Sequence, residues 1–156
     1  MRCSCEVEAR GPHGPVADSE PLYRAAFSPK HIDKKGRLKP SVFPPSHIAN
    51  KGLSLVRTQK VEDSSLAEFC NALSAMQEGR QWCGGFQFSC SILRNIRDED
   101  GRLICVFDDP TEAENGVPAN DAHAIAVSHD GAMSDEDAME VRATIIENAE
   151  QILLAK

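Results

Sequence analysis

Residues 86–107, FQFSCSILRNIRDEDGRLICVF, carry the strongest secondary-structure signals of the chain. In the first part of this stretch apolar and polar side chains alternate, which is typical of a strand with one buried face. The apolar positions are Phe86, Phe88, Cys90 and Ile92. A turn signal (DEDG, 98–101) follows, and residues 103–107 are apolar at every position, as in a strand that is covered on both faces. We therefore predict an antiparallel hairpin.

A third strand is predicted at 122–128, where two kinds of side chain alternate again. One face carries His123, Ile125, Val127 and His129, and the other carries Ala122, Ala124 and Ala126. Because alanine side chains are small, the second face would admit a closely packed helix. Shorter apolar runs predict further strands at 22–27 and 53–56.

Two amphipathic helices are expected. The first begins at residue 64 or 65 and ends near residue 79, with an apolar stripe that we expect to pack in the core. The stripe consists of Leu66, Phe69, Cys70, Leu73 and Met76. The second helix begins at Ser134, which forms a capping-box pattern with Asp137, and runs almost to Lys156.

Together these elements predict an α+β fold, a mostly antiparallel sheet with two main helices packed on one side. We expect residues 21–156 to form a single domain. Residues 1–20 are rich in glycine, proline and charge, and are expected to be a flexible lead-in. Prolines break regular structure between 29 and 45, so this loop must be ordered by its few apolar side chains. These are Ile32, Leu38, Val42 and Phe43.

The composition fits one protein domain in a reducing compartment. The 156 residues are 41 % hydrophobic, which is enough for a core, and a net charge of −7 argues against nucleic-acid partners. No apolar stretch approaches the ~20 residues of a membrane helix, and the start of the chain lacks the apolar segment of a secretion signal. We therefore expect a cytoplasmic protein without membrane association, whose six cysteines are thiols.

His31 and His123 are the candidate catalytic residues. His31 lies in the proline-rich loop and His123 opens a strand, so a folded core can bring both to one rim of the sheet. An imidazole with a pKa near neutral can act as general acid or base. Lys30 and Arg37, within the basic run at 30–39, are candidates for holding phosphate. The alternatives are a hydrogen-bonded structural histidine and a solvated loop, which such residues more often are.

The remaining polar groups predict no cofactor and no metal site. Cys3-x-Cys5 lacks a second pair at zinc-site spacing, and the acidic loop 108–121 lacks a calcium-loop pattern. Cys83 could be an exposed thiol but has no adjacent base. A Walker-type glycine loop, a nucleophile elbow and a dinucleotide fingerprint are all absent from the sequence.

Several segments resemble a family of small uncharacterised bacterial proteins. They are Ser28-Pro29-Lys30-His31-Ile32, Gly36-Arg37-Leu38, Ser41-Val42-Phe43-Pro44, Leu53-Ser54-Leu55 and the later Asn120-Asp121-Ala122-His123-Ala124-Ile125. The family pattern is a His-Pro-Ser-like triplet, a Gly-Arg pair, a Ser-x-x-Phe-x-Pro piece, a Leu-Ser-Val piece and an Asn-Pro-Ala-His-Ala segment. In this chain the proline stands before His31 instead of after it. The resemblance covers about residues 22–155 and implies a bacterial cytosolic protein, without implying an activity.

The leading functional prediction is a non-catalytic accessory or protein-interaction module of a bacterial operon-type system, with a protein partner. The reason is that an enzyme usually shows a nucleophile, a base and an anion holder, and here each candidate stands alone. One alternative is a small hydrolase or transferase that acts on a nucleotide or protein, with His31 and His123 as acid and base. Another is phosphate or nucleic-acid binding through the run at 30–39. An enzyme should gather these groups in a concave pocket, whereas an interaction module should expose a flat apolar patch.

Overall fold

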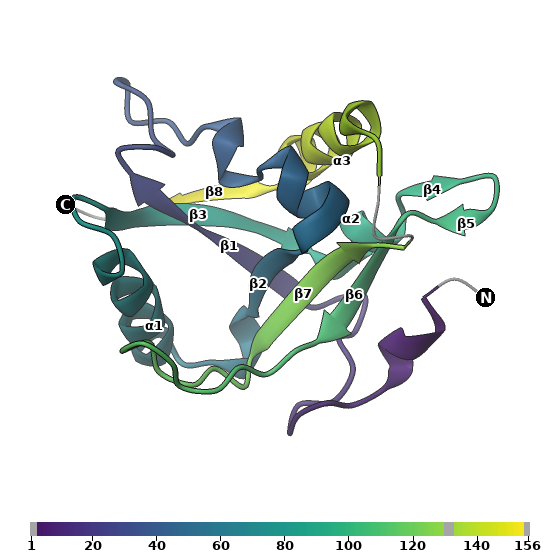
Figure 1. The fold of residues 1–156 in the computed structure, drawn as a ribbon, viewed down its shortest axis with the longest axis horizontal. Helices are drawn as coiled ribbons and strands as arrows, with labels where there is room; N and C mark the ends of the chain where they lie inside the picture. Colours follow the sequence, from purple (N-terminus) through teal and green to yellow (C-terminus); the bar gives the residue numbers. More distant parts are fainter. Residues whose placement is uncertain (1–2, 130–132, 155–156) are drawn as a thin grey trace.

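A six-stranded antiparallel sheet lies at the centre of the molecule, in the order β6-β7-β2-β1-β3-β8 (Figure 1). The computed structural model describes residues 3–129 and 133–154. The strands are β1 (Pro21–Ser28), β2 (Leu53–Arg57), β3 (Gln81–Ser89), β6 (Ile104–Asp108), β7 (His123–Ser128) and β8 (Glu150–Leu153), and the short pair β4 (Arg97–Asp98) and β5 (Gly101–Arg102) stands apart. The helices are α1 (Asp63–Ala75), α2 (Cys90–Arg94) and α3 (Asp135–Asn148), and the short helical turns are η1 (Ser4–Val7), η2 (Pro40–Val42), the π-helix η3 (His47–Lys51) and η4 (Thr58–Lys60). The predicted α+β class is confirmed.

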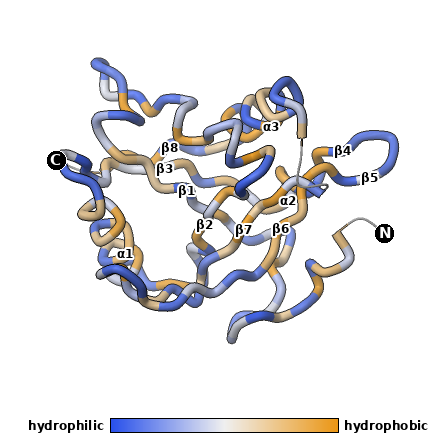
Figure 2. The backbone as a smooth tube through the Cα atoms, in the orientation of Figure 1, coloured by the Kyte–Doolittle hydropathy of each residue, from blue (hydrophilic) through white to orange (hydrophobic). Residues whose placement is uncertain are grey.

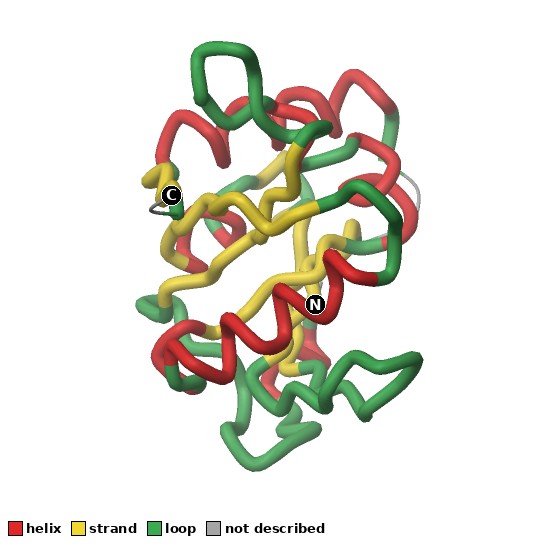
Figure 3. Tube along the Cα trace, turned by 90° about the vertical axis from the view of Figure 1, so that its left-hand side faces the viewer, coloured by secondary structure: helices red, strands yellow, loops and turns green. Residues whose placement is uncertain are grey.

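The two long helices cover opposite faces of the sheet. Successive residues of a strand point to opposite faces, and Leu22 packs in the larger core cluster with α3, whereas Tyr23 packs in a second cluster with Cys70 of α1. Figure 3 shows helical segments on both sides of the strands. The expectation that both main helices pack on one side is therefore wrong. Since β1 and β2 carry buried apolar side chains on both faces, each face needs its own cover.

The predicted hairpin between 86–92 and 103–107 does not form. β3 pairs with β1 and β8, while β6 pairs with β7 at the other side of the sheet. Strand β3 ends because the side chain of Ser89 caps α2 by accepting a hydrogen bond from the backbone N–H of Ser91. Cys90 and Leu93 are then buried at helical spacing, so the apolar alternation does not continue as a strand.

The other predicted elements agree with the structure, apart from the end of the chain. The strands predicted at 22–27, 53–56 and 122–128 correspond to β1, β2 and β7. Ala124 and Ala126 lie in the same core cluster as Ile48 of η3, so the alanine face does receive a helix. Ser134 caps α3, but this helix ends at Asn148, and residues 150–153 add the edge strand β8. The last two residues of the expected helix, 155–156, lie outside the described part.

The segment before β1 is packed against the domain. The carboxylate of Glu6, which is 5 % exposed, accepts hydrogen bonds from Arg94, Arg102 and the backbone N–H of Val106. Val16 belongs to the main core. Figure 1 shows this segment running beside β6. Residues 3–20, which the sequence predicts to be a flexible lead-in, thus contact the domain through acidic groups that pair with the buried Arg57 and Arg94.

Arg57 is the most deeply buried of these arginines. Its side chain has no exposed surface and contacts Glu20 at 2.8 Å and Asp108 at 3.1 Å. Burial alone would raise the pKa of Glu20, but the hydrogen bonds from Arg57 and Ala17 bring this pKa below its ordinary value. The backbone N–H groups of Arg10 and Gly11 also donate to Asp108.

Cys3 and Cys105 form a disulfide across 102 residues of sequence. The expectation that all six cysteines are thiols is therefore wrong for this pair. Among the other cysteines, Cys70 and Cys90 are buried, as expected for small core residues, Cys83 is half-buried and Cys5 is exposed.

Apolar segments follow the sheet, and hydrophilic segments follow the long loops (Figure 2). The loop after β1 is anchored as expected, because Leu38, Val42 and Phe43 are buried. No helix within the described residues has the length and apolar character that a bilayer crossing requires.

Candidate functional site

The candidate site begins where the sheet opens between β1 and β2. These strands pair only at Leu22 with Arg57 and at Tyr23 with Val56. Beyond this point the side chain of Arg24 bridges the two sides, donating from Nε to the carbonyl of Val42 at 3.0 Å and from Nη1 to the carbonyl of Ser54 at 3.1 Å. The guanidinium of Arg24 thus donates to a strand carbonyl, that of Ser54, to which a neighbouring strand would otherwise donate.

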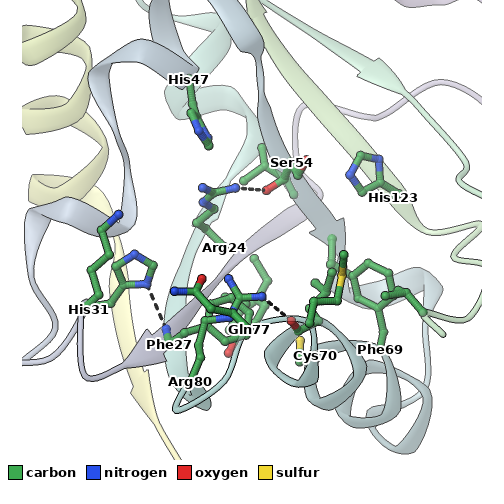
Figure 4. Close-up of a pocket in the computed structure, with 18 of the residues that line it drawn as sticks. Arg24, Phe27, His31, His47, Ser54, Phe69, Cys70, Gln77, Arg80 and His123 are labelled. Atoms are coloured by element: carbon green, nitrogen blue, oxygen red, sulfur yellow. Dashed lines mark hydrogen bonds between the residues drawn. The ribbon is translucent and has the colours of Figure 1, made fainter. Parts of the chain in front are cut away.

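A cavity of about 810 Å³ lies at this opening (Figure 4). It lies between the sheet, α1 and the loops that follow β1 and β6. Five basic side chains line one part of it: Arg24, Lys30, His31, His47 and Arg80. Three exposed carboxylates, those of Glu78, Glu112 and Glu114, also belong to the lining.

Arg24 is the central cation of this cavity. It is partly exposed, yet burial lowers its pKa to about 10, which is low for a guanidinium. Within residues 3–129 and 133–154, no carboxylate forms an ion pair with it. A desolvated cation without a counter-charge is unfavourable, and an anion in the cavity would relieve this cost.

His31 is neutral at pH 7 and faces the same space. Its Nδ1 accepts a hydrogen bond from the backbone N–H of Phe27 at 3.0 Å. Burial, and then the positive charges of Arg24 and Lys30, lower the pKa of His31 to about 4. Because Nδ1 is the acceptor, the proton of the neutral ring resides on Nε2, which can donate a hydrogen bond.

Arg80 adds to the positive potential, and His47 lines the same part of the cavity. Burial, and then Arg24 and Lys51, lower the pKa of His47. The guanidinium of Arg80 lies 4.7 Å from the ring centre of Phe27 and donates to the carbonyl of Leu73. Its Nε is buried and has no hydrogen-bond partner among the described atoms. An unsatisfied donor in a cavity wall is a place where a ligand acceptor is favoured.

The other part of the cavity is apolar. The exposed or half-buried side of α1 contributes Phe69 and Leu73, the residue after the helix contributes Met76, and the sheet contributes Tyr23 and Val56. Only Cys70 of the predicted stripe on this helix is buried. The stripe, expected to pack in the core, therefore serves partly as a cavity wall.

His123 lines the same cavity from β7 and is 6 % exposed. Its Nδ1 lies 2.8 Å from the carbonyl oxygen and 3.1 Å from Oδ2 of Asp109. These two acceptors hold the Nδ1–H tautomer, which leaves the lone pair on Nε2. Ser54 lies diagonally across the β2–β7 pair on the same sheet face, because Val56 stands opposite His123 and Ser54 opposite Ile125.

The two predicted catalytic histidines therefore share a cavity without contacting each other. In Figure 4 they lie apart, with Arg24 and Ser54 between them. Lys30 also lines the cavity, as predicted for a phosphate-holding residue. Arg37 lies outside the lining, in a turn where its Nε is 3.0 Å from Oδ2 of Asp33.

Other polar groups near the predicted site have structural contacts. Burial raises the pKa of Cys83, so this thiol is not activated as a nucleophile. Ser41 donates to the carbonyl of Lys30 at 3.3 Å. In the acidic loop, Asp108 is the buried partner of Arg57 and Asp109 orients His123, so these two carboxylates are not a solvated cluster.

Sequence reasoning missed Arg24, His47 and Arg80. A signal existed for Arg24, because an arginine within the apolar run 22–27 needs a special environment if that run is a buried strand. No local pattern marks His47 or Arg80. They meet Arg24 only because the loop after β1 and the end of α1 fold over the same opening.

Comparisons of the chain with protein-family models, curated proteins and solved structures find no match.

Proposed function

We propose that this protein binds a small molecule with a phosphate-like anionic group and an apolar body in the cavity between β1, β2 and α1. The observation that carries the proposal is Arg24, a desolvated cation at the cavity wall that lacks a carboxylate partner among the described residues. A partly buried charge is stabilised by an opposite charge beside it, and a ligand anion supplies that partner for Arg24.

The neighbours of Arg24 support an oxyanion as the ligand group. Arg80 offers an unsatisfied Nε donor, Lys30 an ammonium group and His31 an Nε2–H donor. Phosphate accepts several hydrogen bonds at once, and arginine suits its geometry particularly well. In this proposal Lys30 still binds the phosphate group, as predicted from the sequence, and Arg24 has the role that the sequence analysis gave to Arg37.

The size and the walls of the cavity support an apolar body on the same ligand. Small-molecule sites commonly measure 300–1,000 Å³, and this cavity measures about 810 Å³. Phe69, Leu73 and Met76 offer an apolar wall opposite the cationic part. An aryl or nucleoside phosphate has this combination of groups.

The same observations disfavour a flat interaction surface. Among the described residues, the large exposed apolar side chains are Val7, Met76, Met139, Leu153 and Leu154, of which only Leu153 and Leu154 are neighbours in the sequence. The accessory or protein-interaction module therefore stays a prediction, and the concave cavity supports ligand binding better.

A second function, hydrolysis or transfer of the bound group, is favoured by one observation. Asp109 holds His123 in the tautomer that a general base requires, with Ser54 on the same sheet face. In this scheme Arg24 holds the anion, and the hydroxyl oxygen of Ser54 attacks phosphorus while its proton passes to Nε2 of His123. The bond from phosphorus to the leaving oxygen breaks, and the leaving group departs as its oxyanion. His31 is neutral and donates from Nε2 to the substrate.

The test is calorimetric titration with p-nitrophenyl phosphate, with inorganic phosphate and p-nitrophenol as partial ligands. We expect the aryl phosphate to bind more tightly than either partial ligand. Arg24→Gln should weaken its binding about ten- to a hundredfold, since a charged hydrogen bond contributes about 1.5–3 kcal/mol. Arg37→Gln is the matched control and should bind normally.

Lys30→Gln guards against misfolding of the Arg24 variant, because Lys30 is exposed. This change should weaken binding while the thermal unfolding curve stays that of the wild type. Equal affinity in the wild type, Arg24→Gln and Lys30→Gln would rule out the cavity as the anion site. Release of p-nitrophenol that disappears in His123→Gln would establish the second function, and binding without release would leave the first alone.

A further inference from the structure

A second cluster of reactive groups lies away from the cavity, where η1 approaches β6 and β7. The Sγ atoms of Cys3 and Cys105 and a ring nitrogen of His129 all lie within 4.8 Å of one another. They come from three distant parts of the chain, so the fold alone brings them together. Cysteine sulfur and histidine nitrogen are the preferred protein ligands of Zn²⁺.

The sheet fixes two of the three groups. Cys105 stands opposite Val127 in the β6–β7 pair, and His129 follows two residues later, so both side chains lie diagonally on one face. The backbone N–H of His129 donates to the carbonyl of Leu103 at 2.9 Å, which extends this pairing beyond β7. Backbone hydrogen bonds between the two chain segments therefore hold both Cys105 and His129 in place.

The N-terminal segment fixes the third group. Cys3 precedes η1, and its carbonyl accepts from the backbone N–H of Glu6 at 3.1 Å. The buried carboxylate of Glu6 is in turn held by Arg94 and by the backbone of β6. These contacts do not depend on the sulfur–sulfur bond, so they can keep Cys3 beside Cys105 after that bond is reduced.

We propose that, when the Cys3–Cys105 disulfide is reduced, Cys3, Cys105 and His129 form a Zn²⁺ site. Two thiolates balance the charge of the ion, which suits a site where Cys105 is 3 % exposed. His129 is exposed, which gives the ion a path of entry. Three protein ligands leave one tetrahedral position for water.

The change of state is a balanced exchange with a dithiol reductant. The reductant donates two electrons to the sulfur–sulfur bond and becomes a disulfide, and its two thiol protons pass to Cys3 and Cys105. Binding of Zn²⁺ then displaces both protons. The cytoplasmic location expected from the sequence corresponds to the zinc form, and an oxidising compartment corresponds to the disulfide form.

The proposal is tested on the full chain with Zn²⁺ in competition with a chromophoric chelator, and with Co²⁺ as a spectroscopic probe. After reduction with a phosphine and its removal, we expect one tightly bound ion per chain and thiolate-to-cobalt charge-transfer absorption. The oxidised protein should show neither. Cys3→Ser and His129→Ala should each weaken metal binding by more than about tenfold.

Cys5→Ser is the matched control, because Cys5 is exposed and lies outside the cluster. This variant should bind as the wild type does. If the reduced wild type binds no more metal than Cys3→Ser, or if binding is lost in Cys5→Ser and kept in His129→Ala, the proposed ligand set is wrong. Thermal unfolding of each reduced variant distinguishes loss of a ligand from loss of the fold.

Discussion

His31 illustrates how one side chain reports the electrostatics of the whole cavity. Its pKa is about 4 because burial disfavours the imidazolium and because Arg24, Lys30, Arg80 and Lys39 repel it. The folded pKa lies below the ordinary value of 6.5, so the unfolded chain binds the proton more readily. His31 therefore contributes stability above pH 6.5, and this contribution is lost as the pH falls from 6.5 towards 4.

We predict that proton NMR of the His31 ring gives a titration midpoint near pH 4. Arg24→Gln should raise this midpoint, because the variant removes a nearby positive charge. Saturating phosphate should raise it as well, since a bound anion offsets the same charges. Arg37→Gln is the control and should leave the midpoint unchanged. A midpoint near 6.5 in the wild type would contradict the burial and charge described for this ring.

At the residue scale, the sequence indicated some members of the site and missed others. His31, His123 and Lys30 could be named because imidazole and ammonium groups are few and chemically distinctive. Their grouping around Arg24 could not, because it depends on how β1 and β2 separate. No repeating pattern of residue types marks the point at which two paired strands separate.

Strand β3 shows how an element can be shaped by a missing side chain. A Cβ atom on Gly85 would collide with the ring of Tyr23 and with the carbonyl oxygen of Arg24. Tyr23 lies on the α1 face, where its hydroxyl accepts a hydrogen bond from Trp82 at 3.1 Å. The glycine therefore lets an aromatic ring lie flat on the sheet beside the cavity.

Gly85→Ala is predicted to destabilise the protein by about 2 kcal/mol, as overpacking of a core does. Urea unfolding measures the change. Gly116→Ala serves as the comparison, because Gly116 has a φ of 82° and open space around its Cβ position. That variant should cost about 1 kcal/mol through backbone conformation alone. A loss for Gly85→Ala no larger than for Gly116→Ala would mean that Tyr23 moves aside freely.

At the element scale, prediction succeeded where one local signal dominated. The strands β1, β2 and β7 and the Ser134 cap of α3 follow directly from apolar pattern and capping chemistry. The hairpin failed because Ser89 competes as a helix cap with the alternation around it. Strand β8 was missed because its residues continue an apolar helical pattern, and its pairing partner β3 is distant in sequence.

At the scale of the whole molecule, acidic side chains near the N-terminal end form ion pairs with arginines of the sheet and of α2 and its neighbours. Glu6 is held by Arg94 and Arg102, and Glu20 is held by Arg57. Composition predicted a flexible lead-in over residues 1–20, since glycine, proline and charge are frequent there. That the partners of these charges lie buried elsewhere could not be predicted, because residue type alone does not reveal burial.

Glu6→Gln is predicted to lower the free energy of unfolding by about 3 kcal/mol, because it leaves buried arginine charge without its partner. This corresponds to a fall in Tm of roughly 10 °C. The matched control is Glu8→Gln, since Glu8 is exposed and two residues away. Differential scanning calorimetry compares the two. Equal Tm values for both variants would show that Glu6 contributes no more than a surface charge.

A hydrogen bond joins the backbone N–H of Val106 to Glu6, which is 100 residues away in the sequence. A disulfide joins Cys3 to Cys105, which are 102 residues apart. During synthesis, residues 3–20 leave the ribosome long before β6 exists, so their carboxylates remain hydrated while the later strands are made. Contacts over such separations form slowly. Residues 3–20 can therefore pack only after β6 has been made, and a nascent chain exposes the outer edge of β6 until they do.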